Sequence, residues 1–244
     1  PLATRHGIVV TNTPHYADYA VAEHTLALIL CCAKHLTRLN SLMHQGVWEE
    51  GNYSLELRDK TLGLIELGGV GTEVARLAQA FGMRVLYYDV RRREDIESLL
   101  GVEYVSKLRK IFEQSDVVTL HLSHTAETEG VITRELLELL KPGAILVNTA
   151  RAEGVDNQAL IELLRERKLS VGLDVYDVEP LGQDNPFRGV ENVVLTPHVA
   201  YHTPETSHNM MRICVDNFVA FFSGHPQNVV NPELLERIKK EKKS

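Results

Sequence analysis

The sequence predicts an α/β domain built on a doubly wound, parallel β-sheet. Two observations carry this prediction. Short apolar runs typical of buried strands recur from residue 61 to residue 195, and amphipathic stretches with helical spacing separate them. Strands that are apolar on both faces need helices on both faces, and a helix is the usual connection between parallel strands.

Length and composition agree with such a core. The chain has 244 residues, of which 44% are hydrophobic and 24% charged, enough for one large domain or two small ones. The formal net charge of −7 argues against nucleic-acid binding, because there is no basic excess to neutralise phosphates. The basic runs Arg91–Arg93 and Lys239–Lys243 are interpreted as solvated surface.

Cysteine usage and hydropathy indicate in which compartment the protein is expected and whether it is expected to bind a metal or a membrane. Cys31, Cys32 and Cys214 have no metal-binding spacing, so we expect buried thiols in a reducing, cytoplasmic compartment and no metal site. The apolar run 26–33 is too short to span a bilayer, and no signal peptide opens the chain, so no membrane partner is expected. The first residue, Pro1, suggests a trimmed chain or a fragment.

The N-terminal part is predicted to contain a strand and a long helix. Residues 7–13 form a short apolar run that ends at Pro14. Residues 20–44 carry apolar side chains at helical spacing, with a fully buried middle. Residues 46–58, which include Trp48, Gly51 and Asn52, are expected to be irregular.

From residue 60 the strand and helix patterns alternate. The predicted strands are 61–67, 84–88, 117–120, 144–147, 170–173 and 193–195. The predicted helices are 70–81, 96–100, 107–114, 134–140, 157–167 and 204–222, with stop signals at Gly82, 141–143 and Gly224.

A glycine-rich turn, Gly68-Gly69-Val70-Gly71, follows the strand predicted at 61–67. In a dinucleotide-binding fingerprint the glycines permit a tight turn, close approach of the diphosphate and close helix packing. Gly68 and Gly71 occupy the second and third glycine positions, whereas Glu66 occupies the first. A side chain there is expected to crowd the turn, and its carboxylate to repel phosphates.

Asp89 ends the next predicted strand, at the usual place for a ribose-binding carboxylate. Such an aspartate accepts hydrogen bonds from a ribose 2′-hydroxyl and repels a 2′-phosphate, which favours NAD over NADP. The neighbouring run Arg91–Arg93 works against that preference, because it lies close enough to attract a 2′-phosphate.

Three residues with catalytic potential, Arg151, Glu179 and His198, each follow a predicted strand. An arginine can clamp a carboxylate, a histidine can transfer a proton near neutral pH, and a carboxylate can hold that histidine in its charged form. The carboxyl ends of parallel strands lie at one edge of the sheet, so the three side chains can share one crevice. With the nucleotide turn, they indicate hydride transfer to a small carboxylate substrate.

From Gly7 to about Pro232 the sequence resembles the D-isomer-specific 2-hydroxyacid dehydrogenases. The matching segments are Ala20–His24, Ala80–Met83, Lys141–Ala144, Val147–Arg151, Gly172–Val175, Glu179-Pro180 and Thr196–His198. The resemblance implies a Rossmann-like NAD-binding domain at residues 14–200, the end of a flavodoxin-like substrate domain at 1–13, and a C-terminal helix and tail at 201–244 that return to it. Most of that substrate domain is expected to be missing from the chain.

The resemblance also implies roles for individual residues. Arg151 would bind the substrate carboxylate, His198 would act as the acid/base, and Glu179 would hydrogen-bond His198. Asp174 would contact the nicotinamide carboxamide, and His121 would lie on the adenosine side. The implied NAD-binding residues are Gly68, Gly69, Val70, Gly71, Asp89, His121, Thr149, Ala150 and Asp174. The implied partners are a small 2-keto or 2-hydroxy acid and, in a homodimer, a second copy of the chain.

Three departures from the family pattern leave alternatives open. Besides Glu66, Ala152-Glu153 stand where a glycine pair is common, and Ser123-His124 where proline and an apolar residue are usual. One alternative is a degenerate dehydrogenase fragment with impaired NAD binding. Another is an NAD-binding, corepressor-like interaction protein, which would use the same fold to bind partner peptides. Residues 199–203 mildly resemble D-lactate dehydrogenases, and Tyr201 could pack against an apolar substrate side chain.

Overall fold

The computed structural model describes residues 2–50 and 54–241, the last four by their backbone alone. The chain divides into two compact units. One comprises residues 18–201, and the other joins residues 1–17 to residues 202–244.

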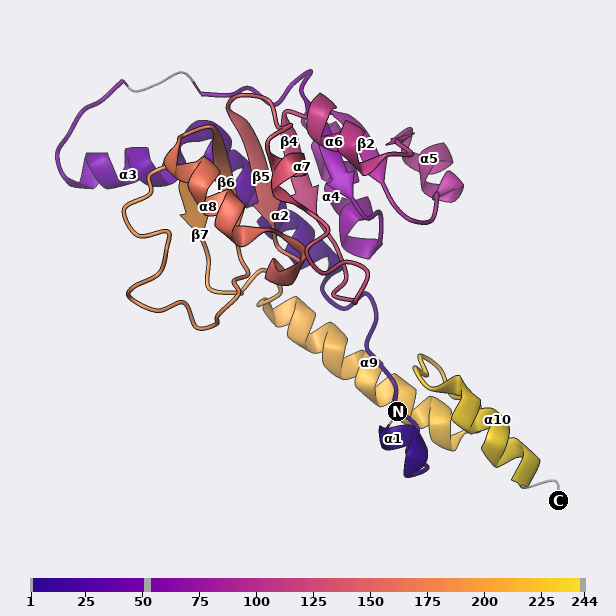
Figure 1. The fold of residues 1–244 in the computed structure, drawn as a ribbon. Helices are drawn as coiled ribbons and strands as arrows, with labels where there is room; N and C mark the ends of the chain where they lie inside the picture. The colour runs from indigo at the N-terminus through magenta and orange to yellow at the C-terminus, as the bar shows by residue number, and fades with distance from the viewer. Residues whose placement is uncertain (1, 51–53, 242–244) are drawn as a thin grey trace. The chain divides into compact units, whose positions relative to one another are not determined.

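A seven-stranded parallel sheet forms the centre of the 18–201 unit (Figure 1). Its strands are β1 (Thr61–Ile65), β2 (Arg84–Tyr88), β3 (Glu103–Tyr104), β4 (Val117–Leu120), β5 (Ala144–Asn148), β6 (Leu169–Leu173) and β7 (Val193–Leu195). The order across the sheet is β3-β2-β1-β4-β5-β6-β7, and each neighbouring pair is parallel. The predicted doubly wound fold is therefore confirmed. The strand order reverses between β1 and β4, which places the expected ligand crevice at the carboxyl ends of these strands.

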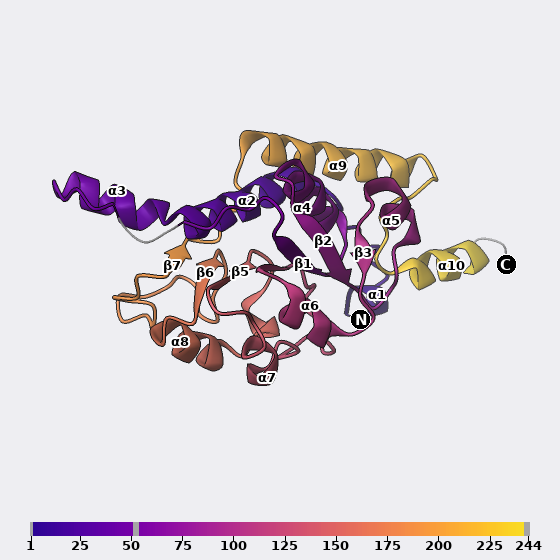
Figure 2. The ribbon, with the colours of Figure 1, turned by 90° about the horizontal axis from the view of Figure 1, so that it is seen from above.

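Helices cover both faces of this sheet (Figure 2). One face packs against α2 (Asp18–Lys34), α4 (Gly69–Ala80) and α5 (Glu94–Leu100), and the other against α6 (Leu108–Gln114), α7 (Arg134–Leu137) and α8 (Asn157–Arg165). Each face has its own apolar cluster. In β5, for example, Ile145 and Val147 belong to one cluster and Leu146 to the other. This alternation explains why the central strands are continuous apolar runs.

Some predicted elements in this unit are wrong. Residues 20–44 do not form one helix, because His35 adopts a left-handed conformation (φ 53°) between α2 and α3 (Leu36–His44). The helix predicted at 134–140 ends at Leu137, beyond which the backbone continues in turns. Strand β3 has only two residues, too few to show a periodicity, and was not predicted. Trp48 lies in irregular backbone as predicted, but Gly51 and Asn52 fall outside the described residues.

The other unit is helical. It contains α1 (Leu2–Arg5), α9 (Pro204–Phe222) and α10 (Pro232–Glu241). Helix α9 has the predicted bounds, and the Thr203 side chain caps it by accepting a hydrogen bond from the Thr206 amide at 3.1 Å. Helices α1 and α10 were not predicted. Residues 242 and 243 of the C-terminal basic run lie outside the described residues.

The strand predicted at 7–13 is wrong. In that segment only Thr11 forms a bridge, which pairs it with Val229 in the antiparallel sense. Side-chain amides make further links to the C-terminal part of the unit: Asn217 donates to the Asn12 carbonyl at 2.8 Å, and Asn231 accepts from the Val10 amide at 2.9 Å. The apolar run is therefore held without a strand ladder.

The thiols only partly match the prediction. All three cysteines are free, and Cys32 is buried, which raises the pKa of its thiol to about 12. Cys214 is exposed on α9, so the prediction of a buried thiol is wrong there. Among the described helices, none is long and apolar enough to cross a membrane. The described residues also contain no group of three or more histidine, cysteine or acidic side chains that could hold a metal ion.

Candidate active site

The glycine-rich turn joins β1 to α4 beside the point where the strand order reverses. Gly68 precedes the helix in extended backbone, and no side chain caps the first turn. A helix start of this kind presents amide N–H groups and a partial positive charge to an anion. A Cβ added at Gly71 would lie 2.5 Å from the Glu66 carbonyl oxygen, whereas one at Gly68 would meet nothing within 4 Å. Gly71 thus permits close packing, and the space over Gly68 is open.

Glu66 keeps the backbone conformation that favours glycine. Its φ is 69°, in the left-handed region, and its amide donates to the Tyr88 carbonyl at 2.8 Å. The side chain is half-buried, and one carboxylate oxygen accepts from the Ser123 amide at 3.1 Å. Burial and the nearby charge of Asp89 raise the pKa of Glu66, and the bond from Ser123 only partly opposes them. Two departures from the family pattern, Glu66 and Ser123, therefore contact each other.

Asp89 ties the end of β2 to the nucleotide turn. One of its oxygens accepts from the Leu67 amide at 2.9 Å and the other from the Arg91 amide at 2.9 Å. The carboxylate borders an open cavity of about 670 Å³, which Glu66 and Gly68 also line. Each carboxylate oxygen has a second lone pair, so Asp89 can still accept a hydrogen bond from a ligand in this cavity.

Two arginines beside the cavity are engaged in ion pairs. Arg92 pairs with Glu97 at 2.8 Å, and Arg93 pairs with Asp95 at 2.9 Å. Arg93 also donates to the Leu67 carbonyl at 2.8 Å. The interpretation of this run as plain solvated surface therefore needs correction, because Arg93 helps to fix the turn that lines the cavity.

His121 follows β4 and packs behind the nucleotide turn. Its Cδ2 atom lies 3.5 Å from the position of a Cβ built on Gly71, and its Nε2 lies 3.1 Å from the Thr119 hydroxyl. Burial lowers the pKa of His121 to about 4, so the ring is neutral near pH 7. His121 can therefore shape this side of the site without adding charge.

The loop after β5 is held by its own asparagine. Asn148 donates from its side-chain amide to the Arg151 carbonyl at 2.8 Å, and its amide oxygen accepts from the Ala150 amide at 3.0 Å. Thr149 is buried, whereas the Arg151 side chain is exposed. The loop thus has a fixed backbone, and the exposed guanidinium of Arg151 donates to the Ala150 carbonyl at 2.6 Å.

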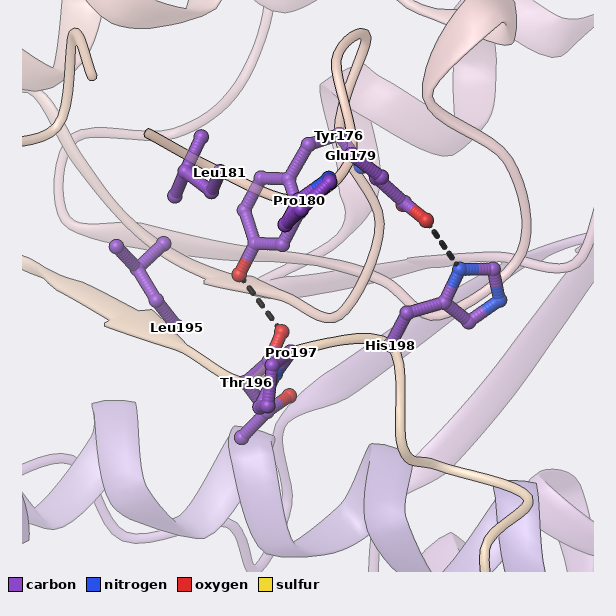
Figure 3. Close-up of a pocket in the computed structure, with 8 residues that line it drawn as sticks. All are labelled: Tyr176, Glu179, Pro180, Leu181, Leu195, Thr196, Pro197 and His198. Carbon is purple, nitrogen blue, oxygen red and sulfur yellow. Dashed lines mark hydrogen bonds and ion pairs between the residues drawn. The ribbon is translucent and has the colours of Figure 1, made fainter. Parts of the chain in front are cut away.

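Glu179 and His198 form a direct pair (Figure 3). One carboxylate oxygen lies 2.7 Å from His198 Nδ1, and the other accepts from the Tyr176 amide at 3.0 Å. Burial alone would raise the pKa of Glu179, but these bonds and the nearby charges of His198 and Arg151 hold it below its ordinary value. The carboxylate is therefore an acceptor near pH 7, which means that Nδ1 carries the proton of this bond. The other ring nitrogen, Nε2, takes no part in this bond.

Of the three predicted catalytic residues, Glu179 and His198 are in direct contact, although they are 19 residues apart in sequence. The charge of Arg151 contributes to the low pKa of Glu179, and a direct contact of Arg151 with the pair stays a prediction. Tyr201 lies edge-on to the imidazole, with ring centroids 6.3 Å apart. These contacts place a carboxylate, an imidazole and an aromatic ring next to one another.

Asp174, at the end of β6, is fully buried. One of its oxygens accepts from the Thr196 hydroxyl at 2.6 Å and the Val199 amide at 3.0 Å, and the other from the Ala200 amide at 2.9 Å. These bonds hold the loop that carries His198. The nicotinamide contact implied by the family resemblance stays a prediction.

Tyr176 is a site residue that sequence reasoning missed. Its hydroxyl donates to the Thr196 carbonyl at 2.8 Å (Figure 3). The same hydroxyl lies 3.2 Å from the Leu173 carbonyl. Together with its amide bond to Glu179, this joins the Glu-Pro loop to the end of β7. Its place between the matching segments Gly172–Val175 and Glu179-Pro180 was the only available indication, because these contacts depend on the tertiary path of the loop.

We call the part of the site formed by Gly68, the start of α4 and Asp89 the nucleotide end. The residues present there fit a dinucleotide. The open space over Gly68, the uncapped start of α4 and the remaining lone pairs of Asp89 suit a diphosphate and a ribose. The Glu66 carboxylate, which lies at the glycine-rich turn itself, opposes a diphosphate there.

Comparisons with known proteins agree with this geometry. The family profile for the NAD binding domain of D-isomer specific 2-hydroxyacid dehydrogenases matches residues 26–200. A glyoxylate reductase from Korarchaeum cryptofilum is 41% identical, over 96% of this chain and 72% of the relative. A D-lactate dehydrogenase from Aquifex aeolicus, solved with NAD and lactic acid, superposes with a TM-score of 0.84 at 34% identity, over 94% of this chain and 75% of that one. An acyclic imino acid reductase solved with NADPH and D-Arg gives a TM-score of 0.85 at 33% identity, over 93% and 73%.

Proposed function

The chain belongs to the D-isomer specific 2-hydroxyacid dehydrogenase family and is an NAD-dependent oxidoreductase; we propose that Arg151, Glu179 and His198 perform its chemistry on a small 2-keto acid. The observation that carries the proposal is the 2.7 Å bond between Glu179 and His198, and the charge of Arg151 contributes to the lowered pKa of that Glu179. These groups supply a general acid, its orienting carboxylate and a carboxylate clamp.

Each residue has a distinct task in this scheme. Bound NADH supplies the hydride. Arg151 binds the substrate carboxylate and orients the carbonyl, and its charge polarises the carbonyl oxygen. His198 donates a proton from Nε2 to that oxygen, and Glu179 stabilises the charged imidazole through Nδ1. In the oxidation direction, Nε2 accepts the proton of the substrate hydroxyl.

We propose that the chain prefers NAD to NADP. The Asp89 carboxylate faces the cavity where a ribose would lie, and a 2′-phosphate there would be repelled. Of the arginines that line this cavity and could offset the repulsion, Arg92 and Arg93 are paired with Glu97 and Asp95, and Arg91 lies beside them. One similar structure contains NADPH. Similarity to these proteins therefore does not decide between NAD and NADP, and the proposal rests on the residues of this chain.

The substrate proposal rests on the names of relatives and on one aromatic contact. The relatives include glyoxylate and hydroxypyruvate reductases, and a similar structure contains lactic acid. Tyr201, edge-on to His198, suits a small apolar substituent next to the reacting carbon. We therefore propose glyoxylate, hydroxypyruvate and pyruvate as the class of substrate.

The family resemblance supports three further proposals. Residues 14–200 would form the NAD-binding domain, with 1–13 and 201–244 belonging to a substrate domain. The division of the chain after residues 17 and 201 supports this assignment. We also propose a homodimer, to be tested by analytical ultracentrifugation, and a cytoplasmic location, which the three free thiols support.

A dehydrogenase with an impaired NAD site is the second candidate. It is favoured by the Glu66 carboxylate, which lies beside Asp89 at the nucleotide turn. NADH consumption with the three 2-keto acids separates the candidates. We expect turnover by the wild-type chain, a loss of about 10³-fold in His198→Ala, and no loss in the exposed control His44→Ala. A folded wild-type chain that consumes no NADH with any of the acids would contradict the proposal.

A further inference from the structure

Two adjacent residues of α2 contact both loops that carry the proposed catalytic residues. We propose that His24 and Thr25 are positioning residues, with Thr25 holding the loop of Arg151 and His24 holding the loop of His198. The inference rests on the proposed function, because it concerns how the two halves of the 2-keto acid site are kept at a fixed separation.

Thr25 is fully buried and reaches the loop after β5. Its hydroxyl donates to the Val21 carbonyl at 2.8 Å and lies 2.8 Å from the Thr149 hydroxyl. A hydroxyl has one proton to donate, so the Thr149 hydroxyl must be the donor between the two threonines. From its other side, the same loop is tied by the bond from Asn148 to the Arg151 carbonyl. The backbone that carries Arg151 is thus fixed at two points.

His24 reaches the loop after β7 from the neighbouring position on α2. Its Nε2 lies 3.0 Å from the Thr196 hydroxyl oxygen and 3.7 Å from the nearer Asp174 oxygen. The Thr196 hydroxyl gives its proton to Asp174 at 2.6 Å, so it accepts from His24. His24 is therefore a donor through Nε2, at the start of a chain of hydrogen bonds that leads to Asp174.

Asp174 links the contact of His24 to the backbone next to His198. It accepts from the amides of Val199 and Ala200, the two residues that follow His198. His198 itself has a φ of 54°, a left-handed backbone conformation that costs a non-glycine residue free energy and persists where its surroundings hold it. Its imidazole position therefore depends on the bonds that fix the next two residues.

Helix α2 is a rigid base for both contacts. It packs on the sheet at Gly172 of β6, where an added Cβ would lie 2.9 Å from the Leu28 Cβ. Leu28 and Ile29 are buried in the apolar cluster on that face. A helix held this closely cannot shift one contact without the other, so the spacing between the two loops is set by His24 and Thr25 together.

The test uses substitutions that remove one hydrogen bond at a time. We expect Thr25→Val to raise KM for the 2-keto acid about 3- to 10-fold with little change in kcat, because the Arg151 loop loses its tie. We expect His24→Ala to lower kcat by a similar factor. Thr25→Ser and His24→Gln keep a hydroxyl and a donor, and should restore most of each loss. The exposed residues Thr37 and His44 of α3 provide matched controls, Thr37→Val and His44→Gln.

Amide hydrogen exchange tests the same contacts without turnover. His24→Ala should speed exchange at Val199 and Ala200, and Thr25→Val at Ala150, by about 3- to 10-fold each and without affecting the other loop. Equal kinetics and exchange in variants and controls would overturn the inference, as would a loss of stability alone, with no separation between KM and kcat. If the wild type shows no turnover, the proposed function fails and the exchange pattern alone decides the inference.

Discussion

The catalytic end and the nucleotide end of the site are built differently. At the catalytic end, Glu179 and His198 match the family pattern; the Tyr176 amide orients Glu179, and Glu179 in turn bonds His198. At the nucleotide end, Glu66 replaces a glycine yet keeps a left-handed φ of 69°. That conformation costs a non-glycine residue about 1–2 kcal/mol. The turn therefore requires a left-handed residue at position 66. Glycine adopts this conformation most easily, but in this chain Glu66 adopts it.

The largest expected effect is on the catalytic end alone, with no change at the nucleotide end. Arg151→Ala should lower kcat/KM for the 2-keto acid by about 10³-fold, because a carboxylate then lacks its charged partner. NADH affinity should stay unchanged, because the nucleotide turn lies elsewhere at the strand ends. Steady-state kinetics and fluorescence titration with NADH measure the two quantities. Arg109→Ala, on the exposed face of α6, is the control. An equal loss of NADH affinity would contradict the assigned role.

A smaller effect tests the catalytic pair through pH. Glu179 has a pKa below its ordinary value, so it is ionised throughout the neutral range and favours the charged imidazole of His198. In Glu179→Gln that charge is gone. The pH at which reduction declines should therefore move down by about one unit. A pH–rate profile of kcat/KM measures the shift, and an unmoved profile would mean that the pair does not act in the reaction.

Glu66 is the test of the nucleotide end. Glu66→Gly should strengthen NADH binding by about 10-fold, because it removes both a charge near the diphosphate and a side chain that crowds the turn. Glu66→Gln removes only the charge, and so separates repulsion from crowding. Calorimetric titration with NADH measures both variants. If neither differs from the wild type, the carboxylate held by the Ser123 amide is already compatible with the cofactor.

The smallest effect concerns the core beneath the nucleotide end. The buried Ser115 hydroxyl makes no hydrogen bond within the described part of the chain, and a Cβ added at Gly63 of β1 would overlap it. Ser115→Ala should leave the free energy of unfolding unchanged or raise it by about 1 kcal/mol, with NADH affinity unaltered. Urea denaturation measures this. A clear destabilisation would show that the hydroxyl has a role in the packing of β1.

The sequence predicted the sheet well and the short or strained elements poorly. Strands β2, β4 and β7 and helix α9 have the predicted bounds, because each is a distinct apolar run or periodic segment with clear stop signals. The break at His35 could not be predicted, since no glycine or proline marks it. The two residues of β3 form a strand only by pairing with β2.

Some residues of the site could also be predicted from the sequence, whereas others could not. Their positions after predicted strands and the family resemblance identified Glu179 and His198, and the structure brings their side chains together. The ties from His24 and Thr25 were not predicted, because they join α2 to loops more than 100 residues later. Such contacts depend on how α2 packs on the sheet, and a single sequence carries no spacing rule for them.

Parallel titrations of the chain with NADH and NADPH, followed by nicotinamide fluorescence, test the central claim most directly: the nucleotide end still accepts NAD although Glu66 stands beside Asp89. The account predicts saturable NADH binding and clearly weaker NADPH binding. Absence of NADH binding by the folded chain would contradict the claim, and so would equal binding of the two cofactors.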